Sequence, residues 1–269
     1  MEKIARKLSE FTAARLAGAG LALVVGLSSP IAAHADEAAA KSLFKNMSDY
    51  MAAQKNISFN YDTDFDVVTK QNQKLTLAAS GTLVINRPDK IRNNRSGGFA
   101  DVEMLFDGKT LTLFGKNANA YTQVEVPGTL DHLIDQLRNK FNRPLPGADL
   151  LMSNPQAELM DGVNDIKDLG SGVIGGVECD HLAFRTKDVD WEIWIAQGDR
   201  PYPCRYVITS KQVTGWPQYS IQLRDWKSGD EVTADDFAFN NSTNAKKIEL
   251  KDLPNADDLP KNFVRGKLK

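Results

Sequence analysis

The sequence has little histidine and cysteine, and it lacks the common catalytic signatures. Only three of its 269 residues are histidine and two are cysteine. It contains no Gly-x-Ser-x-Gly, no His-Glu-x-x-His and no glycine loop with the spacing of a phosphate-binding site. Two histidines after residue 35 are too few for a histidine-rich metal site. We therefore expect no enzyme activity, no metal and no other cofactor.

The N-terminal apolar run is too short to cross a membrane comfortably, which takes roughly 20 residues. This run, residues 16–27, follows four basic residues and precedes Ser28-Ser29-Pro30 and a small-residue stretch that ends at Ala35. The order is typical of a secretory signal peptide. We predict a signal peptide at residues 1–35, cleaved between Ala35 and Asp36, and a periplasmic mature protein. An uncleaved membrane anchor is the alternative.

The sequence has no block of basic residues. Cleavage removes four basic and two acidic residues and lowers the formal net charge from −2 to −4. A mildly acidic chain without a basic patch has no electrostatic footprint for nucleic acid. The 234 remaining residues can bury one core. We predict a single domain at residues 36–240 and a polar tail at residues 241–269 that wraps loosely or is disordered.

Two cysteines in an exported chain favour a disulfide between Cys179 and Cys204. The expected strand order argues against this disulfide, because the strands that carry the two cysteines lie on either side of a third strand. Strands separated by a third lie roughly 10 Å apart, and Cα atoms beyond about 7 Å cannot be bridged. A fold-back of the loop at residues 197–203 would close the gap. Whether the two cysteines pair is open at this point.

Residues 81–126 read as strands joined by tight turns, with Asp107-Gly108 as the clearest hairpin signal. Apolar side chains at alternate positions predict a sheet with one apolar face. Further strands are expected at 57–68, 166–169, 177–185, 190–196, 204–210, 220–226 and 237–239, with helices at 36–54, 129–141, 148–152 and 155–160. The fold class is therefore α+β, with helices at the start and in the middle.

The order of these parts resembles the periplasmic lipoprotein carriers LolA and LolB. It runs from a helix and strand to Gly81-x-Leu-x-Ile-x-Arg-Pro and Asp107-Gly-Lys-x-Leu-x-Leu, then a helical plug and a second meander. The stretches at residues 179–185 and 190–195 resemble an uncharacterised branch of predicted periplasmic proteins with a domain of unknown function. The resemblance implies a curved antiparallel half-barrel of about 11 strands, with helices as a lid over an apolar cavity for acyl chains.

Candidate cavity residues follow from strand parity and position, although a one-residue slip would exchange the two faces. They are Leu83, Ile85, Leu105, Leu111, Leu113, Phe184, Trp191 and Ile193 on the sheet, with Leu133 and Leu137 on the lid.

The sequence thus predicts a non-catalytic carrier for a lipid or for the acyl chains of a lipoprotein, which meets a membrane surface only transiently. The alternative is an envelope-stress sensor or protein-interaction module with the same fold, for which the acidic face at Asp62–Asp66 would serve. The ligand, the partner membranes and the oligomeric state do not follow from the sequence. A nucleophilic pair of Cys179 and His181 is the weaker interpretation, because a disulfide would abolish it.

Overall fold

The structure is a computed structural model that describes residues 31–98, 100–141, 143 and 145–253. Residues 1–30 of the predicted signal peptide and residues 254–269 of the predicted tail lie outside this range. The helix α1 begins at Ile31, before the predicted cleavage point.

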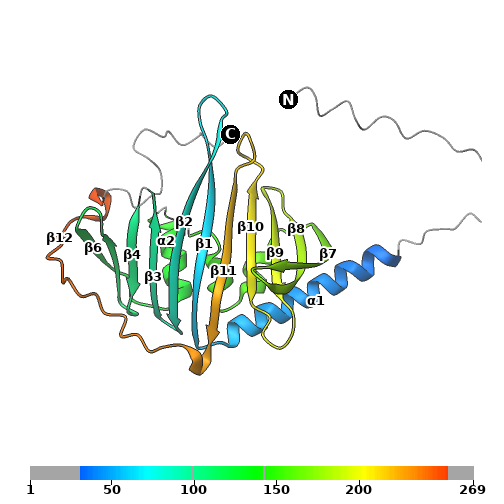
Figure 1. The fold of residues 1–269 in the computed structure, drawn as a ribbon, viewed down its shortest axis with the longest axis horizontal. Coiled ribbons are helices and arrows are strands. Elements are labelled where there is room, and N and C mark those ends of the chain that lie inside the picture. The colour runs from blue at the N-terminus through cyan, green and yellow to red at the C-terminus, as the bar shows by residue number, and fades with distance from the viewer. Residues whose placement is uncertain (1–30, 99, 142, 144, 254–269) are drawn as a thin grey trace, which may run out of the picture.

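One large sheet dominates the molecule (Figure 1). Its strands are β1 (Asn56–Val68), β2 (Lys74–Asn86), β3 (Lys90–Gly97), β4 (Asp101–Phe106), β5 (Thr110–Gly115), β6 (Ala120–Glu125), β7 (Asp165–Ile174), β8 (Val177–Arg185), β9 (Val189–Ala196), β10 (Pro203–Ser210), β11 (Gln218–Ser228) and β12 (Lys246–Lys247). The helices are α1 (Ile31–Ala53), α2 (Leu130–Asn139) and α3 (Pro155–Met160), with short 3-10 turns η1 (Ala148–Leu151), η2 (Gly229–Glu231) and η3 (Leu250–Asp252).

The sheet order is β12-β6-β5-β4-β3-β2-β1-β11-β10-β9-β8-β7, and only the two-residue β12 pairs in parallel, with β6. Two meanders, β1–β6 and β7–β11, join through the antiparallel pair of β1 and β11. α2, η1 and α3 connect the meanders. The predicted α+β half-barrel of about 11 strands with a helical lid is confirmed.

α1 lies across one side of the sheet and contacts β7, β8 and β9 (Figure 1). Ala40, Phe44, Met47 and Met51 recur at helical spacing and are fully buried. α2 begins where predicted, because the Thr129 hydroxyl accepts a hydrogen bond from the backbone N–H of His132. The helices thus bury their apolar stripes against the concave face of the sheet.

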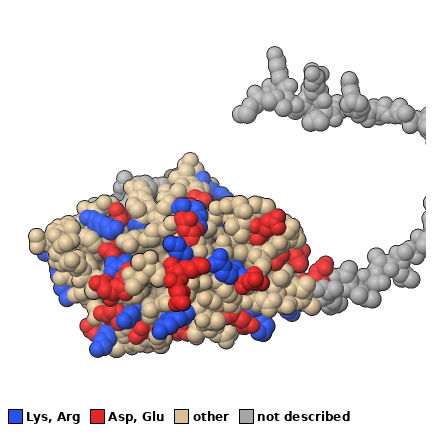
Figure 2. Space-filling model, turned by 60° about the horizontal axis from the view of Figure 1, so that its bottom comes forward, with Lys and Arg blue, Asp and Glu red and all other residues tan. Residues whose placement is uncertain are grey.

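Charges of both signs are intermixed on the face of the molecule shown in Figure 2. Arg92 donates to Asp235 at 2.8 Å and thereby fixes the segment after η2 to the outside of β3. Phe239 then packs against Tyr121, with ring centroids 4.8 Å apart. The strand predicted at residues 237–239 is wrong, because this segment attaches by side chains and forms no backbone ladder.

Two further boundaries differ from the sequence prediction. β7 continues through the glycines at 170 and 172 with an irregularity between Asp168 and Ser171, so the turn to β8 is only Gly175-Gly176. Residues 241–253 of the predicted tail lie against β6, where Leu253 is 6% exposed.

Candidate ligand cavity

A partly open cavity of about 720 Å³ lies between the concave face of the sheet and the lid formed by α2 and η1. Its walls come from β1–β5, from β10 and β11, and from the lid. We call this part of the molecule the hollow half. Its volume falls in the range of roughly 300–1,000 Å³ that is usual for small-molecule sites.

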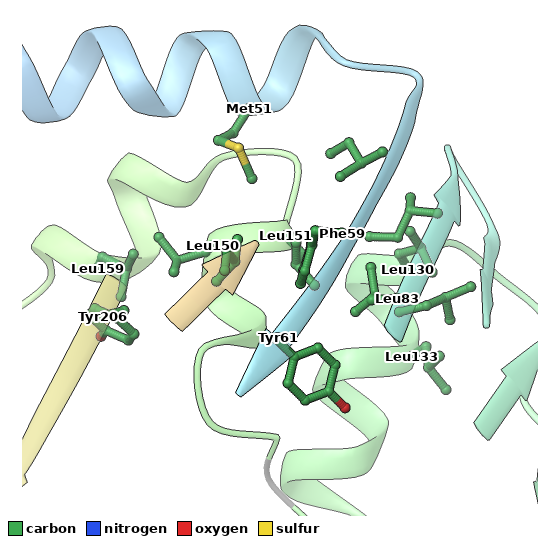
Figure 3. Close-up of a cluster of buried hydrophobic side chains, with 14 of the residues drawn as sticks. Met51, Phe59, Tyr61, Leu83, Leu130, Leu133, Leu150, Leu151, Leu159 and Tyr206 are labelled. Carbon is green, nitrogen blue, oxygen red and sulfur yellow. The ribbon is translucent and has the colours of Figure 1, made fainter. Parts of the chain in front are cut away.

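Strand register places one row of four apolar residues and Asn93 across the cavity wall. Phe59, Leu83, Asn93, Met104 and Leu113 lie opposite one another on five successive strands. Since side chains alternate between faces, all five point to the concave side. Figure 3 shows the labelled side chains of β1 and β2 near Leu130 and Leu133 of α2 and Met51 of α1.

The next row, two residues along each strand, includes the polar side chains of Tyr61 and Arg95. Tyr61, Gly81, Arg95 and Val102 lie opposite one another there. The Tyr61 hydroxyl donates to Asn93 Oδ1 at 2.7 Å. A Cβ atom on Gly81 would lie 2.3 Å from Tyr61 Cζ, so the missing side chain makes room for the tyrosine ring.

The rim carries the exposed apolar residues of this region. Val213 and Pro217, in the turn between β10 and β11, line the cavity, and Trp216 between them is 59% exposed. Leu145, which precedes η1, also lines the cavity and is 37% exposed.

Asp66 lies at the same rim, and its carboxylate is bound by Thr76, the Gln218 backbone and Lys74. Burial opposes its ionisation, but hydrogen bonds from Thr76, the Gln218 backbone and Lys74 outweigh this and lower the pKa of the Asp66 carboxyl. Asp66 is therefore a paired anion at the cavity edge.

The other side of the concave face, formed by β7–β9 under α1, is filled; we call it the packed half. Phe184 and Trp191 stack there with ring centroids 3.8 Å apart, and Phe44 of α1 packs on both, at 5.2 and 5.4 Å. Phe44 thus packs directly on these two rings, and all three side chains are buried.

The ten predicted cavity residues therefore divide between regions. Leu83, Ile85, Leu113, Leu133 and Leu137 line the cavity. Phe184, Trp191 and Ile193 are buried in the packed half, Leu111 is buried in the core beside Phe106, and Leu105 is buried on the convex side. Leu105 was assigned to the wrong face, since its neighbour Met104 has the inward parity. The other four face inward but do not line the cavity, because parity sets the face of a strand and not which element covers it.

Sequence reasoning missed Tyr61, Asn93, Arg95 and Arg143, which line the cavity. A signal for two of them was present, since Asn93 and Arg95 share parity with Ile91 on β3. Arg143 lies in the loop after α2 and had no comparable signal.

The two cysteines meet in a small buried cluster with Ala196. Both are free thiols and lie in the same buried cluster. The pairing of β9 with β10 is irregular between Pro203 and Arg205, beside Cys204, and the small Ala196 of β9 lies opposite Cys179. Burial raises the pKa of both thiols, which makes each a poor nucleophile.

His181 is engaged in a structural contact on the convex face. Its Nε2 lies 2.8 Å from Glu192 Oε2, and its ring stacks on Trp194. Among the described residues, no three His, Cys, Asp or Glu side chains cluster as metal ligands. In the same part of the chain, no helix has the length and hydropathy to cross a membrane.

Residues 40–251 match a family model described as "Predicted periplasmic protein (DUF2092)". The chain belongs to this family. The match confirms the predicted relation to an uncharacterised family of periplasmic proteins and the predicted periplasmic location of this DUF2092 protein. Cleavage of the signal peptide stays a prediction. No curated protein matches the chain.

Three solved structures are distantly similar to this DUF2092 protein. LprF from Mycobacterium bovis is 15% identical over 75% of this chain and 98% of that chain, with a TM-score of 0.46. The lipoprotein LppX from Mycobacterium tuberculosis is 14% identical over 74% of this chain and 100% of that chain, with a TM-score of 0.39. The LolA superfamily protein NE2245 from Nitrosomonas europaea is 11% identical over 74% of this chain and 99% of that chain, with a TM-score of 0.33. Similarities this distant assign no ligand.

Proposed function

We propose that this protein binds an apolar, chain-like ligand in the hollow half, without catalysing a reaction. A lipid or the acyl chains of a lipoprotein would fit this description. The main support for this proposal is the cavity of about 720 Å³ with mainly apolar walls. In the packed half, by contrast, buried side chains cover the concave face of the same sheet. Protein interiors are normally close-packed, so an apolar space of this size favours a ligand.

The hydrophobic effect supplies enough free energy for such binding. Burying one methylene group contributes about 0.8 kcal/mol, so ten contribute about 8 kcal/mol. This corresponds to a dissociation constant of about 1 μM before the costs of ordering the ligand are subtracted. A carrier of this kind needs no covalent step.

The exposed rim suggests how the ligand enters. Leu145 lines the cavity and is exposed, and the exposed Trp216 lies in the turn between the lining residues Val213 and Pro217. Trp prefers the boundary between water and an apolar phase. We propose that this rim touches the membrane surface transiently while the ligand is exchanged.

The test is native mass spectrometry of the mature chain, residues 36–269, purified from periplasm and then extracted with organic solvent. We expect a stoichiometric lipid or acyl adduct. Ile221→Trp should abolish the adduct, because Ile221 lines the cavity and the indole would fill it. Leu169→Trp, at a position 48% exposed on β7, is the matched control and should keep the adduct. A clean apo mass with no uptake from vesicles would contradict the proposal.

A protein partner is the second candidate. β7 is an edge strand with Leu169 and Val173 48% and 65% exposed, which suits the addition of a partner strand. The acidic face of β1 is a poorer site, since Arg224 donates to Asp62 at 2.7 Å and neutralises it. An apo mass together with weaker partner binding by Val173→Lys would favour this candidate.

A further inference from the structure

We propose that Asn93 is a specificity-determining residue of the cavity, which donates a hydrogen bond to a carbonyl oxygen of the bound ligand. The ligand would then be an acyl ester or an acyl amide, and not an ether or a plain hydrocarbon. This inference rests on the proposed function and narrows its ligand class. The observation behind it is an amide group with unused donors on an otherwise apolar stretch of the cavity wall.

Asn93 occupies the middle of the row that crosses the cavity wall. It lies opposite Leu83 of β2 on one side and Met104 of β4 on the other, and all three residues line the cavity. Phe59 and Leu113 continue the row on β1 and β5. The Asn93 amide is therefore the only polar side chain in this row of five, and apolar side chains flank it on both neighbouring strands.

Tyr61 fixes the orientation of this amide. Its hydroxyl donates to Asn93 Oδ1 at 2.7 Å, and the residue is only 4% exposed. Gly81 leaves room for the ring, since a Cβ atom there would lie 2.3 Å from Tyr61 Cζ. A ring packed in this way has little freedom to move, so the amide oxygen stays directed at the hydroxyl. The two N–H groups of Asn93 Nδ2 then point away from Tyr61.

The Asn93 Nδ2 donors have no partner in the part of the chain that the structure describes. The contact with Tyr61 is the only hydrogen bond of the Asn93 side chain there. Asn93 Nδ2 does not belong to the fully buried side-chain atoms that lack a hydrogen-bond partner, so it is accessible. Because the side chain lies on the concave side and lines the cavity, the access is from the cavity.

A ligand that fills the cavity displaces water from these donors. A buried donor left without an acceptor costs free energy, so a ligand with an acceptor at this level binds more tightly than one that is apolar there. A carbonyl oxygen is a strong acceptor with two lone pairs. In acyl esters and amides it lies where the apolar chain meets the head group, which suits a donor surrounded by apolar side chains.

The experiment measures the affinity of the delipidated mature chain for three uncharged probes with the same chain length and the same dihydroxypropyl head. Monopalmitoylglycerol is the ester, the second probe has N–H in place of the ester oxygen, and the third is the hexadecyl ether, with CH₂ in place of the carbonyl. We expect the ester or the amide to bind about tenfold more tightly than the ether, because only a carbonyl satisfies the donor well. The preferred carbonyl probe separates an acyl ester from an acyl amide.

Variants locate the preference at Asn93. Asn93→Leu has the same branched shape without donors and should bind all three probes with equal affinity. Tyr61→Phe removes only the hydroxyl that orients the amide and should keep part of the preference. Asn94→Leu is the matched control, because it makes the same change at the next position, on the other face, where the Asn94 side chain accepts from Lys116. It should keep the full preference. Near-ultraviolet circular dichroism checks that each variant folds.

Infrared spectroscopy gives a readout that needs no variant. A hydrogen bond weakens the C=O bond of its acceptor. The carbonyl stretch of the isotope-labelled ester or amide, bound to the wild-type chain, should therefore lie below its frequency in hexadecane. An unshifted band would overturn the proposed hydrogen bond.

The outcomes separate this inference from the proposed function. Ether binding as tight as that of both carbonyl probes would overturn the carbonyl preference and leave the apolar cavity supported. A preference that survives Asn93→Leu would overturn the assignment to Asn93. Failure of all three probes to bind would contradict the proposed function itself. The comparison of wild-type affinities decides the first point even if a variant does not fold.

Discussion

The packed half and the hollow half are two parts of one concave face, yet one is filled and the other encloses a cavity. Both are built from alternating strands with large apolar residues on the inner side. In the packed half, α1 brings Phe44 against Phe184 and Trp191. In the hollow half, α2 and η1 leave about 720 Å³ open. The covering element, not the strand pattern, makes the difference.

The largest expected effect comes from opening the packed half. Phe44→Ala should lower the free energy of unfolding by about 3–5 kcal/mol, because it removes a fully buried ring from a close-packed cluster. Leu83→Ala should lower the free energy of unfolding by less, because the Leu83 side chain already borders the cavity. Urea unfolding of both variants measures the difference, and equal losses would contradict the division into halves.

A disulfide between Cys179 and Cys204 would further stabilise the packed half. We expect Cys179 and Cys204 to join when a disulfide-form oxidoreductase accepts their two hydrogens, since both thiols are free and lie in the same buried cluster. Closing the loop between them should stabilise the fold by about 3 kcal/mol. Peptide mapping without reductant detects the bond. Two alkylatable thiols in protein purified from periplasm would show that the pair stays reduced.

A methyl group at Gly81 tests the shape of the hollow half. Gly81→Ala should cost about 1–3 kcal/mol and weaken ligand binding, because its Cβ would lie 2.3 Å from Tyr61 Cζ and 2.3 Å from the Asn94 carbonyl oxygen. Gly98→Ala is the control, since a Cβ there meets nothing within 4 Å. Thermal unfolding and probe binding give the two readouts, and similar behaviour of both variants would refute the steric argument.

Acid should weaken the packed half through Asp190. Hydrogen bonds from Arg185 and Lys211, against opposition from burial, lower the pKa of this carboxyl to about 2. Because the folded-state pKa is depressed, the stabilisation is present above the unfolded value near 3.8 and fades as pH falls toward 2. Asp190→Asn should cost about 1 kcal/mol at neutral pH, since the pair is partly solvated. The difference from the wild type should shrink as pH falls from about 4 through 2, where the wild-type carboxyl is half protonated, and a constant difference would contradict this origin.

The smallest effect on stability is expected at the rim. Trp216→Ser should change the free energy of unfolding by less than about 0.5 kcal/mol, because the side chain is 59% exposed. Uptake of lipid from vesicles should nevertheless slow. An uptake rate equal to that of the wild type would exclude Trp216 from membrane contact.

Local patterns in the sequence predicted much of the fold. Thr129 followed by an apolar stripe gave the start of α2, and Asn154-Pro155 gave α3. Alternation in β1 and β2 gave the strands and their apolar faces. These features depend on residues close in the chain, so capping, turn chemistry and periodicity are enough to specify them.

The same patterns gave wrong predictions where contacts between distant parts of the chain determine the structure. Phe237 and Phe239 have the composition of a strand, but Arg92 holds their segment by Asp235 on the outside of the sheet. Phe184, Trp191 and Ile193 have the inward parity of cavity residues, but α1 covers them. Cys179 and Cys204 share one buried cluster although β9 separates their strands, and the irregular pairing of β9 with β10 beside Cys204 is not predicted by any local motif.

The sequence by itself therefore determined most of the elements, the alternation along the long strands and the family to which the chain belongs. Only the tertiary structure decided which half of the concave face is filled, and that Arg95 and Arg143 lie on the wall of the other half. The physical reason is that alternation is a property of one strand. The space between a sheet and its helices depends on side chains from elements far apart in the chain, such as Phe44 and Trp191, packing against one another.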